Sequence, residues 1–204
     1  RGAERVSEAL AELDLKNAPA FSPFVPLYEM LAQQLPEAVL VGDSTAPVYA
    51  GNHLVSQPAP RRYFNASTGY GTLGYGLPAA LGAKLAQPAL PVVALVGDGG
   101  VMFTLSELAT AVEEQIPIVV LLWHNAGYEE IRRYMDDNGV ARLGVDLQAP
   151  NFMTLADGFG CPSVHIESPA ELAVVLAERD HQRPLLIEID SSAWQQRITP
   201  SETP

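Results

Sequence analysis

Short runs of apolar residues alternate with helical patterns along most of this chain. The apolar runs have the length and β-branched content of strands, and they cover 38–42, 92–96, 118–123, 163–166 and 184–189. The segments between them carry apolar residues at helical spacing, at 24–35, 76–86, 104–115, 151–158 and 168–178. Strands that are apolar on both faces and separated by helices indicate a parallel sheet covered on both sides. The pattern therefore predicts an open, doubly wound α/β fold with a mainly parallel sheet of about six strands.

The two ends of the chain differ from its centre. Residues 1–23 combine an amphipathic helical pattern with a proline-bearing stretch, which is typical of a connecting helix followed by a linker. Residues 193–204 are polar, contain two prolines and predict a tail. The compact domain is expected over 24–192. Because the chain begins at Arg1 rather than at a methionine, we expect it to be a piece of a longer polypeptide, in which 1–23 lead from an upstream domain.

One helix start has a clear local signal. Thr104-Leu-Ser-Glu107 has the Thr-x-x-Glu form of a capping box, in which the two side chains satisfy each other's backbone N–H groups. It predicts a helix that begins at Thr104, directly after Gly99-Gly100.

The composition disfavours nucleic acid and membranes as partners. The chain has 12 Lys and Arg against 24 Asp and Glu, a formal net charge of −12, whereas a DNA-binding surface needs a basic stripe. The longest uncharged apolar run, 116–123, is about half the length that crosses a bilayer. The single cysteine, Cys161, cannot form an internal disulfide, which favours a reduced, cytoplasmic protein.

Two strand ends carry the residues with the clearest chemistry. Asp98 follows one predicted strand and Asn125 follows the next, with 25 residues between Gly99 and Asn125. That spacing holds one loop, one helix and one strand, so both side chains are expected at the same edge of the sheet. Carboxylate, amide and carbonyl oxygens suit Mg²⁺. Asp98, Asn125 and the carbonyl of Gly127 therefore form a candidate magnesium site.

Glycines beside this site suit a diphosphate. Gly97, Gly99 and Gly100 allow the backbone to bring N–H groups close to phosphate oxygens, and the helix expected from Thr104 adds a positive dipole end. Taken singly, Gly-Asp-Gly and Asn-x-Gly are more often ordinary turns. Their pairing at this spacing favours a metal-bridged diphosphate site.

Other motifs carry less weight. Residues 69–74 form a literal G-x-G-x-x-G, but the preceding stretch 60–68 is too polar for the central strand that a dinucleotide fingerprint follows. The four histidines have no metal-ligand spacing, and we predict structural roles for His53, His124, His165 and His181.

Two motifs resemble a known family. Gly97-Asp98-Gly99, with Asn125 downstream, resembles the thiamine diphosphate (ThDP) signature, and 71–80 (Gly-Thr-Leu-Gly-Tyr-Gly-Leu-Pro-Ala-Ala) is similar to a segment of acetolactate synthases and related decarboxylases. The resemblance spans about 39–190. On these residues the chain is identified as the C-terminal, diphosphate-binding domain of a ThDP-dependent enzyme of the acetolactate synthase and 2-oxo acid decarboxylase family.

The resemblance implies a set of binding residues. Asp98 and Asn125 would ligate Mg²⁺ through their side chains and Gly127 through its carbonyl. Leu73 stands where acetolactate synthases have the Met that props the cofactor into its bent shape. The implied contacts with the cofactor are Asp43, Ser44, Thr45, Gly71, Leu73, Gly97, Gly99, Gly100 and Tyr128.

The resemblance also implies what the chain lacks. In this family the reaction is C–C bond cleavage or ligation at a 2-oxo acid, and the glutamate that protonates the cofactor comes from a separate pyrimidine-binding domain, normally of the partner subunit. Nothing in this sequence matches that domain, so no residue is assigned a catalytic role. We expect the domain to be inactive alone and to work in a homodimer or homotetramer.

One region points to a substrate. Residues 127–135, 144–146 and 150–152 resemble the 5-guanidino-2-oxopentanoate (2-ketoarginine) decarboxylase branch of the family. The acidic residues there either attract a guanidinium or form a solvated face, and both interpretations remain open for Glu129, Glu130, Asp136 and Asp137.

Two alternatives compete with this interpretation. The chain could be a natural short subunit that meets a separate pyrimidine-domain subunit. It could also be a non-catalytic module of the same fold that binds a nucleotide or a flavin.

Overall fold

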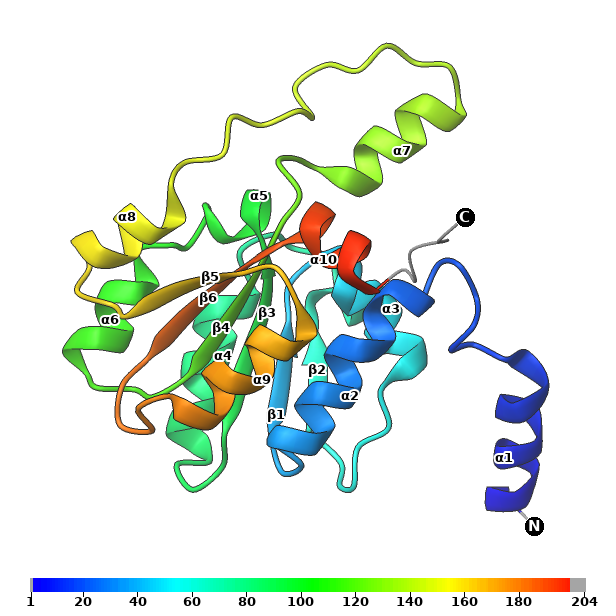
Figure 1. The fold of residues 1–204 in the computed structure, drawn as a ribbon, viewed down its shortest axis with the longest axis horizontal. Coiled ribbons are helices and arrows are strands. Elements are labelled where there is room, and N and C mark those ends of the chain that lie inside the picture. The colour runs from blue at the N-terminus through cyan, green and yellow to red at the C-terminus, as the bar shows by residue number, and fades with distance from the viewer. Residues whose placement is uncertain (1, 199–204) are drawn as a thin grey trace.

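Six parallel strands form the centre of the fold in the computed structural model, which describes residues 2–198 (Figure 1). They are β1 Val39–Gly42, β2 Tyr63–Asn65, β3 Val92–Gly97, β4 Val119–His124, β5 Ser163–Ile166 and β6 Leu185–Asp190. Their order across the sheet is β2-β1-β3-β4-β6-β5, and every neighbouring pair is parallel. The chain moves outward from β1 to β2 and then crosses to β3 on the other side of β1. This arrangement confirms the predicted doubly wound α/β fold.

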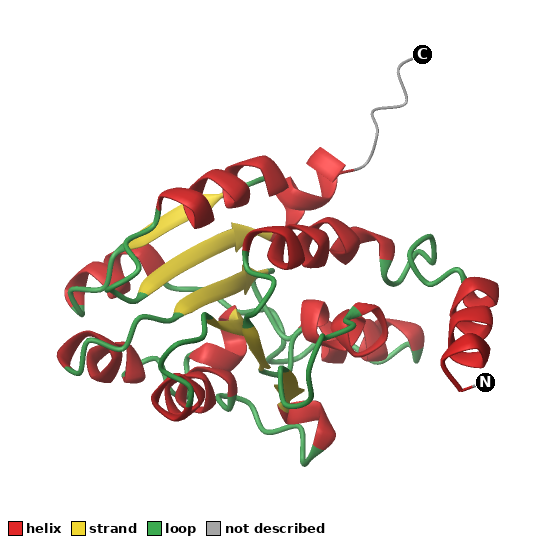
Figure 2. Cartoon of the chain, turned by 90° about the horizontal axis from the view of Figure 1, so that it is seen from below, coloured by secondary structure: helices red, strands yellow, loops and turns green. Residues whose placement is uncertain are grey.

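Helices lie on both sides of the sheet (Figure 2). The α-helices are α1 Gly2–Leu13, α2 Val25–Gln34, α3 Ala46–Leu54, α4 Gly76–Ala86, α5 Asp98–Val101, α6 Glu107–Glu113, α7 Glu129–Asp137, α8 Phe152–Gly158, α9 Pro169–Glu178 and α10 Ser191–Ile198. Two short 3₁₀ helices are η1 Ser22–Phe24 and η2 Ala66–Thr68. Within the described residues, no helix combines the length and the apolar character needed to cross a membrane.

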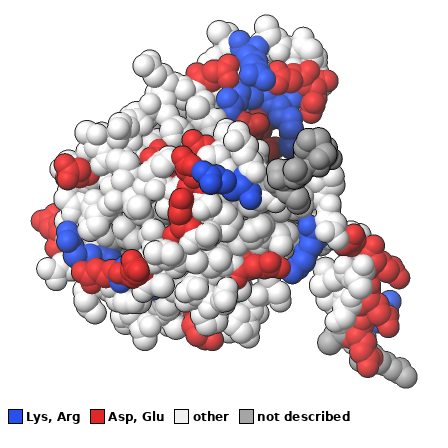
Figure 3. Space-filling model, in the orientation of Figure 1, with Lys and Arg blue, Asp and Glu red and all other residues white. Residues whose placement is uncertain are grey.

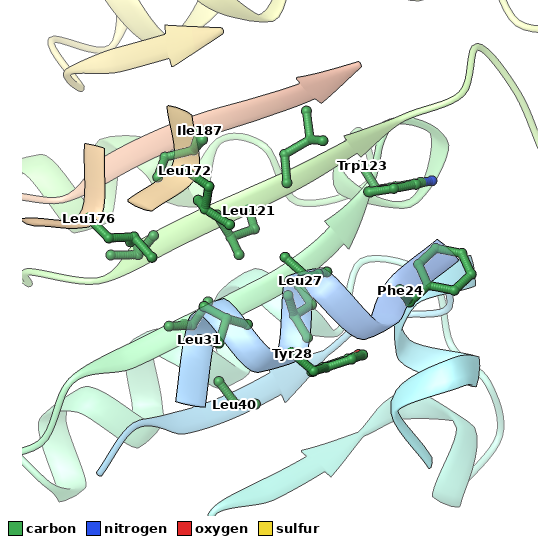
Figure 4. Packing of buried hydrophobic residues seen from close by; sticks show 14 of the residues in the cluster. Phe24, Leu27, Tyr28, Leu31, Leu40, Leu121, Trp123, Leu172, Leu176 and Ile187 are labelled. Carbon is green, nitrogen blue, oxygen red and sulfur yellow. The ribbon is translucent and has the colours of Figure 1, made fainter. Parts of the chain in front are cut away.

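The strands are apolar at successive positions because both faces of the sheet are buried. On one face, α2, α3, α9 and α10 pack on strand residues such as Leu40, Leu121 and Ile187 (Figure 4). On the other face, α4, α6 and α8 pack on residues such as Val41 and Val96. Because neighbouring strand residues point to opposite faces, two separate hydrophobic layers form, as the continuous apolar runs predict.

Two elements beside β1 lie outside the predicted pattern. β2 is a three-residue edge strand within the polar stretch 60–68, and it pairs with β1 alone. An edge position tolerates this polarity because one side of the strand has no neighbour. α3 contains Pro47 and Gly51, whose low helix propensity weakens the helical signal.

The predicted capping box is wrong. α6 begins at Glu107 and ends at Glu113, so it is shorter than the predicted 104–115, and its N-cap Ser106 makes no side-chain cap hydrogen bond. The Thr104 hydroxyl instead donates to the Gly74 carbonyl at 2.9 Å. A long-range contact with the 71–76 loop takes the group that the sequence motif assigns to the helix.

The ends of the chain also differ from the prediction. α1 forms where the amphipathic pattern predicts it and extends away from the sheet (Figure 1). The expected tail from residue 193 is wrong as far as residue 198, because 191–198 form α10 and Trp194 is fully buried. Trp194 lies edge-on to Trp123 with ring centroids 6.0 Å apart, and its Nε1–H donates to the Pro23 carbonyl at 3.2 Å. The remaining residues of the predicted tail, 199–204, lie outside the described residues.

Gly51 in α3 lies tightly against two tyrosine hydroxyls. The Tyr28 and Tyr63 hydroxyls donate to the carbonyls of Pro47 and Val48, at 2.5 and 2.9 Å, and burial raises the pKa of Tyr63 to about 12. A methyl group at Gly51 would overlap both hydroxyl oxygens. We expect Gly51→Ala to lower the free energy of unfolding by about 1–3 kcal/mol in urea denaturation, despite the better helix propensity of Ala.

Gly82→Ala is the matched control. Gly82 lies in α4 with nothing within 4 Å of an added methyl, so this variant should gain about 0.5–1 kcal/mol. A similar gain in both variants would contradict the packing explanation.

Candidate functional site

A pocket of about 490 Å³ lies at the carboxyl ends of β1, β3 and β4. The direction of winding changes between β1 and β3, and in open α/β sheets such a switch point is where ligands bind. A second cavity of about 540 Å³ lies between α2 and residues 54–58, but its lining is mainly apolar. Lys16 and Glu29 in that lining pair with each other at 2.6 Å, so we assign the site to the switch-point pocket.

The pocket gathers eleven of the twelve residues that the sequence assigns to cofactor and metal. They are Ser44, Thr45, Gly71, Leu73, Gly97, Asp98, Gly99, Gly100, Asn125, Gly127 and Tyr128. Sequence analysis did not assign a pocket position to Ala46, Tyr49, Ser67, Gly69, Tyr70 and Ile131, which also line it. Tyr49 lies on α3, a helix that the sequence pattern does not reveal, so no local signal marks it.

Three oxygen-bearing groups converge in this pocket. One terminal atom of the Asn125 carboxamide lies 3.1 Å from Asp98 Oδ1 and 2.8 Å from the Gly127 carbonyl oxygen. If that atom is nitrogen, it donates to both oxygens; if it is oxygen, three oxygens face one another. An octahedral Mg²⁺ with bonds of about 2.0–2.1 Å separates neighbouring ligand oxygens by about 2.9 Å. The donor set and its spacing therefore fit a magnesium ion.

Backbone N–H groups hold the Asp98 carboxylate in place. Asp98 is 3% exposed, and it accepts hydrogen bonds from Gly99 N at 3.0 Å and from Gly127 N at 3.1 Å. Burial raises the pKa of Asp98, while these N–H groups and the nearby His124 ring act in the opposite direction. Within the described residues, no group of three or more His, Cys, Asp or Glu could hold a metal ion. The candidate metal set accordingly combines one carboxylate with neutral oxygens.

The loop that carries Asn125 and Gly127 is fixed from outside. Tyr128 N donates to the Val145 carbonyl at 2.9 Å, and Arg132 Nη2 donates to the Asn125 carbonyl at 2.8 Å. A side chain at Gly127 would meet the Val145 carbonyl oxygen, so this position requires glycine. Residues 145–147 and α7 therefore fix the orientation of Asn125 and Gly127.

The glycines after β3 do not form the predicted loop. α5 begins at Asp98 itself, so Gly99 and Gly100 lie in its first turn rather than in a link to a helix at Thr104. The first-turn N–H groups of a helix have no intrahelical partners, and they can face an anion. The Tyr128 ring lies against Gly99, which closes this side of the pocket.

Asp43 is the predicted contact that does not line the pocket. It is fully buried, and its carboxylate accepts from Ser44 N at 2.7 Å, Gly74 N at 3.2 Å and Gly76 N at 2.9 Å. Burial raises the pKa of Asp43, and the N–H groups of Gly76, Ser44 and Gly74 oppose that rise. Asp43 therefore anchors the 71–76 loop, which carries Leu73, from behind the pocket.

The acidic residues of α7 are mostly neutralised by arginines, as the mixed colours around α7 indicate in Figure 3. Glu129 and Glu130 line the pocket, but both are paired with arginines one helical turn later. Glu129 forms an ion pair with Arg132, and Glu130 forms one with Arg133. Asp136 pairs with Arg142 at 2.6 Å and does not line the pocket. Asp137 is exposed. Only the first two of the four acidic residues are thus available to the pocket.

The fold and the pocket define a doubly wound α/β domain with its ligand site at the switch point. Residues 42–189 match the family described as "Thiamine pyrophosphate enzyme, C-terminal TPP binding domain", and the chain belongs to this family. This confirms the resemblance seen in the sequence: the chain is the ThDP-binding domain of the 2-oxo acid decarboxylase and acetolactate synthase family. The nucleotide- or flavin-binding alternative is set aside.

Known relatives are much longer than this chain. It is 42% identical over 161 residues to the probable 2-ketoarginine decarboxylase AruI of Pseudomonas aeruginosa, which covers 78% of this chain and 29% of that protein. It is 36% identical over 121 residues to acetolactate synthase isozyme 3 large subunit of Escherichia coli, covering 58% of this chain and 21% of that protein. The ThDP-dependent 4-hydroxybenzoylformate decarboxylase of Rhodococcus jostii superposes with a TM-score of 0.74 at 27% identity, over 82% of this chain and 32% of that one.

The three hydrogen bonds to the Asp43 carboxylate should contribute to the stability of the fold. Asp43→Asn replaces one acceptor oxygen by a donor, so at least one of the three N–H groups loses its partner. We expect a loss of about 1–3 kcal/mol in the free energy of unfolding, measured by urea denaturation. Ser44→Ala, which removes a hydroxyl that bonds to the Gly71 carbonyl and to Tyr49 but is not a buried charge, should cost about 0.5–1 kcal/mol or less. Equal losses would show that the buried carboxylate has no special role.

Proposed function

We propose that the pocket binds the diphosphate of ThDP through Mg²⁺ held by Asp98, Asn125 and the Gly127 carbonyl. The convergence of these three oxygen-bearing groups is the observation that carries the proposal. Gly100 offers a backbone N–H group to the phosphates, Gly99 lies beside it with its own N–H on Asp98, and Ser44, Thr45 and Gly71 approach from the β1 side. Gly97 allows close passage of the backbone beside Thr45.

The pocket walls suit the remainder of the cofactor. When bound, ThDP supplies the carbanion that attacks a 2-oxo carbon and the ring that accepts the electrons released with carbon dioxide. Leu73 presents an apolar side chain from the loop anchored by Asp43, where it would support the bent cofactor. Tyr128 and Ile131 would exclude water from the other side.

The activity of the whole protein is a further part of the proposal. We infer that the protein is a 2-oxo acid decarboxylase of the 5-guanidino-2-oxopentanoate type, supported by the 42% identity to the P. aeruginosa protein. Glu129 and Glu130 lie at the pocket where they could meet a guanidinium, although their arginine partners weaken that attraction. The glutamate that activates the cofactor would come from a pyrimidine-binding domain in a homodimer or homotetramer.

Calorimetry tests the metal bridge. ThDP titrated into the protein with Mg²⁺ should bind, and a chelator should abolish the signal. Asp98→Ala should weaken ThDP binding by more than about 100-fold and Asn125→Ala by about 10–100-fold. Substituting a residue that only supports a metal ligand already lowers metal affinity by about 10–100-fold, so loss of a direct ligand should have at least that effect. Asp157→Ala, which removes an exposed carboxylate on α8, should bind like the wild type. Unchanged affinity in chelator would reject the metal bridge.

Steady-state decarboxylation tests the substrate. The protein encoded by the complete gene should turn over 5-guanidino-2-oxopentanoate with a higher kcat/KM than pyruvate, because part of the binding energy comes from the guanidinium end. Residues 1–204 alone should turn over neither compound, since no activating glutamate is assigned within them. Preference for pyruvate would contradict the substrate assignment, and turnover by the pure fragment would contradict the need for a second domain.

A further inference from the structure

Four polar side chains form a row beside the pocket, from four neighbouring strands. Asp98 follows β3, His124 ends β4, Glu188 lies in β6 and His165 lies in β5. His124 Nε2 is 3.9 Å from Asp98 Oδ2, His124 Nδ1 is 2.7 Å from Glu188 Oε1, and His165 Nδ1 is 3.3 Å from Glu188 Oε2. The row connects the candidate metal ligand to the edge strand of the sheet.

Glu188 is the buried centre of this row. It is 7% exposed, and on its face of the sheet its neighbours Leu186, two positions back in β6, and Leu122, its partner on β4, are buried apolar residues. A carboxylate in such surroundings loses its hydration, and only hydrogen-bond donors offset that loss. In the described part of the chain, the ion pairs of Glu188 go to the two histidines and none goes to a lysine or arginine. An apolar residue would be the simpler occupant of this strand position, so the carboxylate calls for another explanation.

The hydrogen bond to Glu188 fixes the His124 ring. Carboxylate oxygens only accept, so His124 Nδ1 is the donor. The Phe152 ring holds the imidazole from the side in an edge-to-face contact, with centroids 5.7 Å apart. With Nδ1 bound to Glu188, the opposite edge of the ring, which carries Nε2, faces Asp98 Oδ2.

The two oxygens of Asp98 have different surroundings. Each oxygen accepts one backbone N–H, Oδ1 from Gly99 and Oδ2 from Gly127, but Oδ2 also faces the His124 ring whereas Oδ1 faces the Asn125 carboxamide. We propose that Glu188 is a positioning residue of the metal site, which holds the His124 ring so that Asp98 presents Oδ1 to the cation. This inference rests on the proposed magnesium site. A carboxylate that orients a histidine beside a metal is a common supporting arrangement, although here the histidine faces a metal ligand rather than the metal.

His165 provides a matched control at the other end of the same carboxylate. Its side chain is 43% exposed, its bond to Glu188 is longer, and it makes no approach to Asp98. Removing the His165 ring leaves the Glu188–His124 bond in place. A role of Glu188 in general stability would depend on both histidines, whereas a role in the metal site depends on His124.

Glu188→Met is the test. Met has nearly the volume of Glu but neither acceptor oxygen, so His124 Nδ1–H loses its hydrogen-bond partner. We expect the Mg²⁺ dissociation constant, titrated into the complete protein with ThDP present, to rise about 10-fold. His165→Gln should stay within about twofold of the wild type. ¹⁵N NMR should show the His124 proton on Nδ1 in the wild type and altered His124 ring-nitrogen shifts in Glu188→Met.

The outcomes separate the possible explanations. Mg²⁺ affinity of Glu188→Met within about twofold of the wild type, or an equal loss in His165→Gln, would overturn the positioning role. A wild-type spectrum with the His124 proton on Nε2 would overturn it without any variant, even if Glu188→Met fails to fold. Wild-type protein that binds no Mg²⁺ with ThDP would instead refute the proposed function, before the variants are compared, and this inference would fall with it.

Discussion

The close approach of three oxygen-bearing groups at the tips of β3 and β4 is the constraint on which the site depends. Lone pairs separated by 2.8 and 3.1 Å repel one another unless a proton or a cation lies between them. The parallel register pairs Gly97 with Trp123, so β3 and β4 end at the same level of the sheet. Asp98 and Asn125, which follow the two strands, therefore lie side by side. The surrounding backbone donors keep the carboxylate from turning away.

Two buried aspartates at neighbouring strand ends have opposite tasks. Asp43, after β1, has both oxygens engaged by backbone N–H groups and does not line the pocket. Asp98, after β3, is held by two N–H groups but keeps Oδ1 directed toward the pocket. One carboxylate shapes the loop that carries Leu73, and the other faces the pocket. Burial alone would not distinguish them, because both are nearly inaccessible to solvent.

The sequence predicts the central strands and the meeting of Asp98, Asn125 and Gly127 in one pocket, for the same physical reason. Strands buried on both faces are apolar at every position, and the residues just after them are fixed by the fold. Elements with weaker local signals were missed: β2 is a short edge strand, α3 contains Pro47 and Gly51, and the polar residues around Trp194 resemble a tail. Each is stabilised by tertiary contacts that have no local signature.

Long-range contacts also explain the wrong assignments at the site. Thr104 matches a capping motif, but its hydroxyl binds the Gly74 carbonyl across the pocket rim. Asp43 follows β1 as a ligand contact would, yet the 71–76 loop folds over it and takes all its acceptors. The partners of both residues lie about thirty positions away, which no local pattern could reveal.

The two tryptophans of the chain provide an intrinsic fluorescence probe. Trp123 and Trp194 are its only indole groups, and they lie edge to face in the hydrophobic layer that α2, α3, α9 and α10 form on the sheet. Trp123 stands two positions before Asn125, so any displacement at the tip of β4 changes the geometry of the ring pair. Ultraviolet emission from the unlabelled protein should therefore report the docking of α10 and any movement at the tip of β4, without a dye or a reporter mutation.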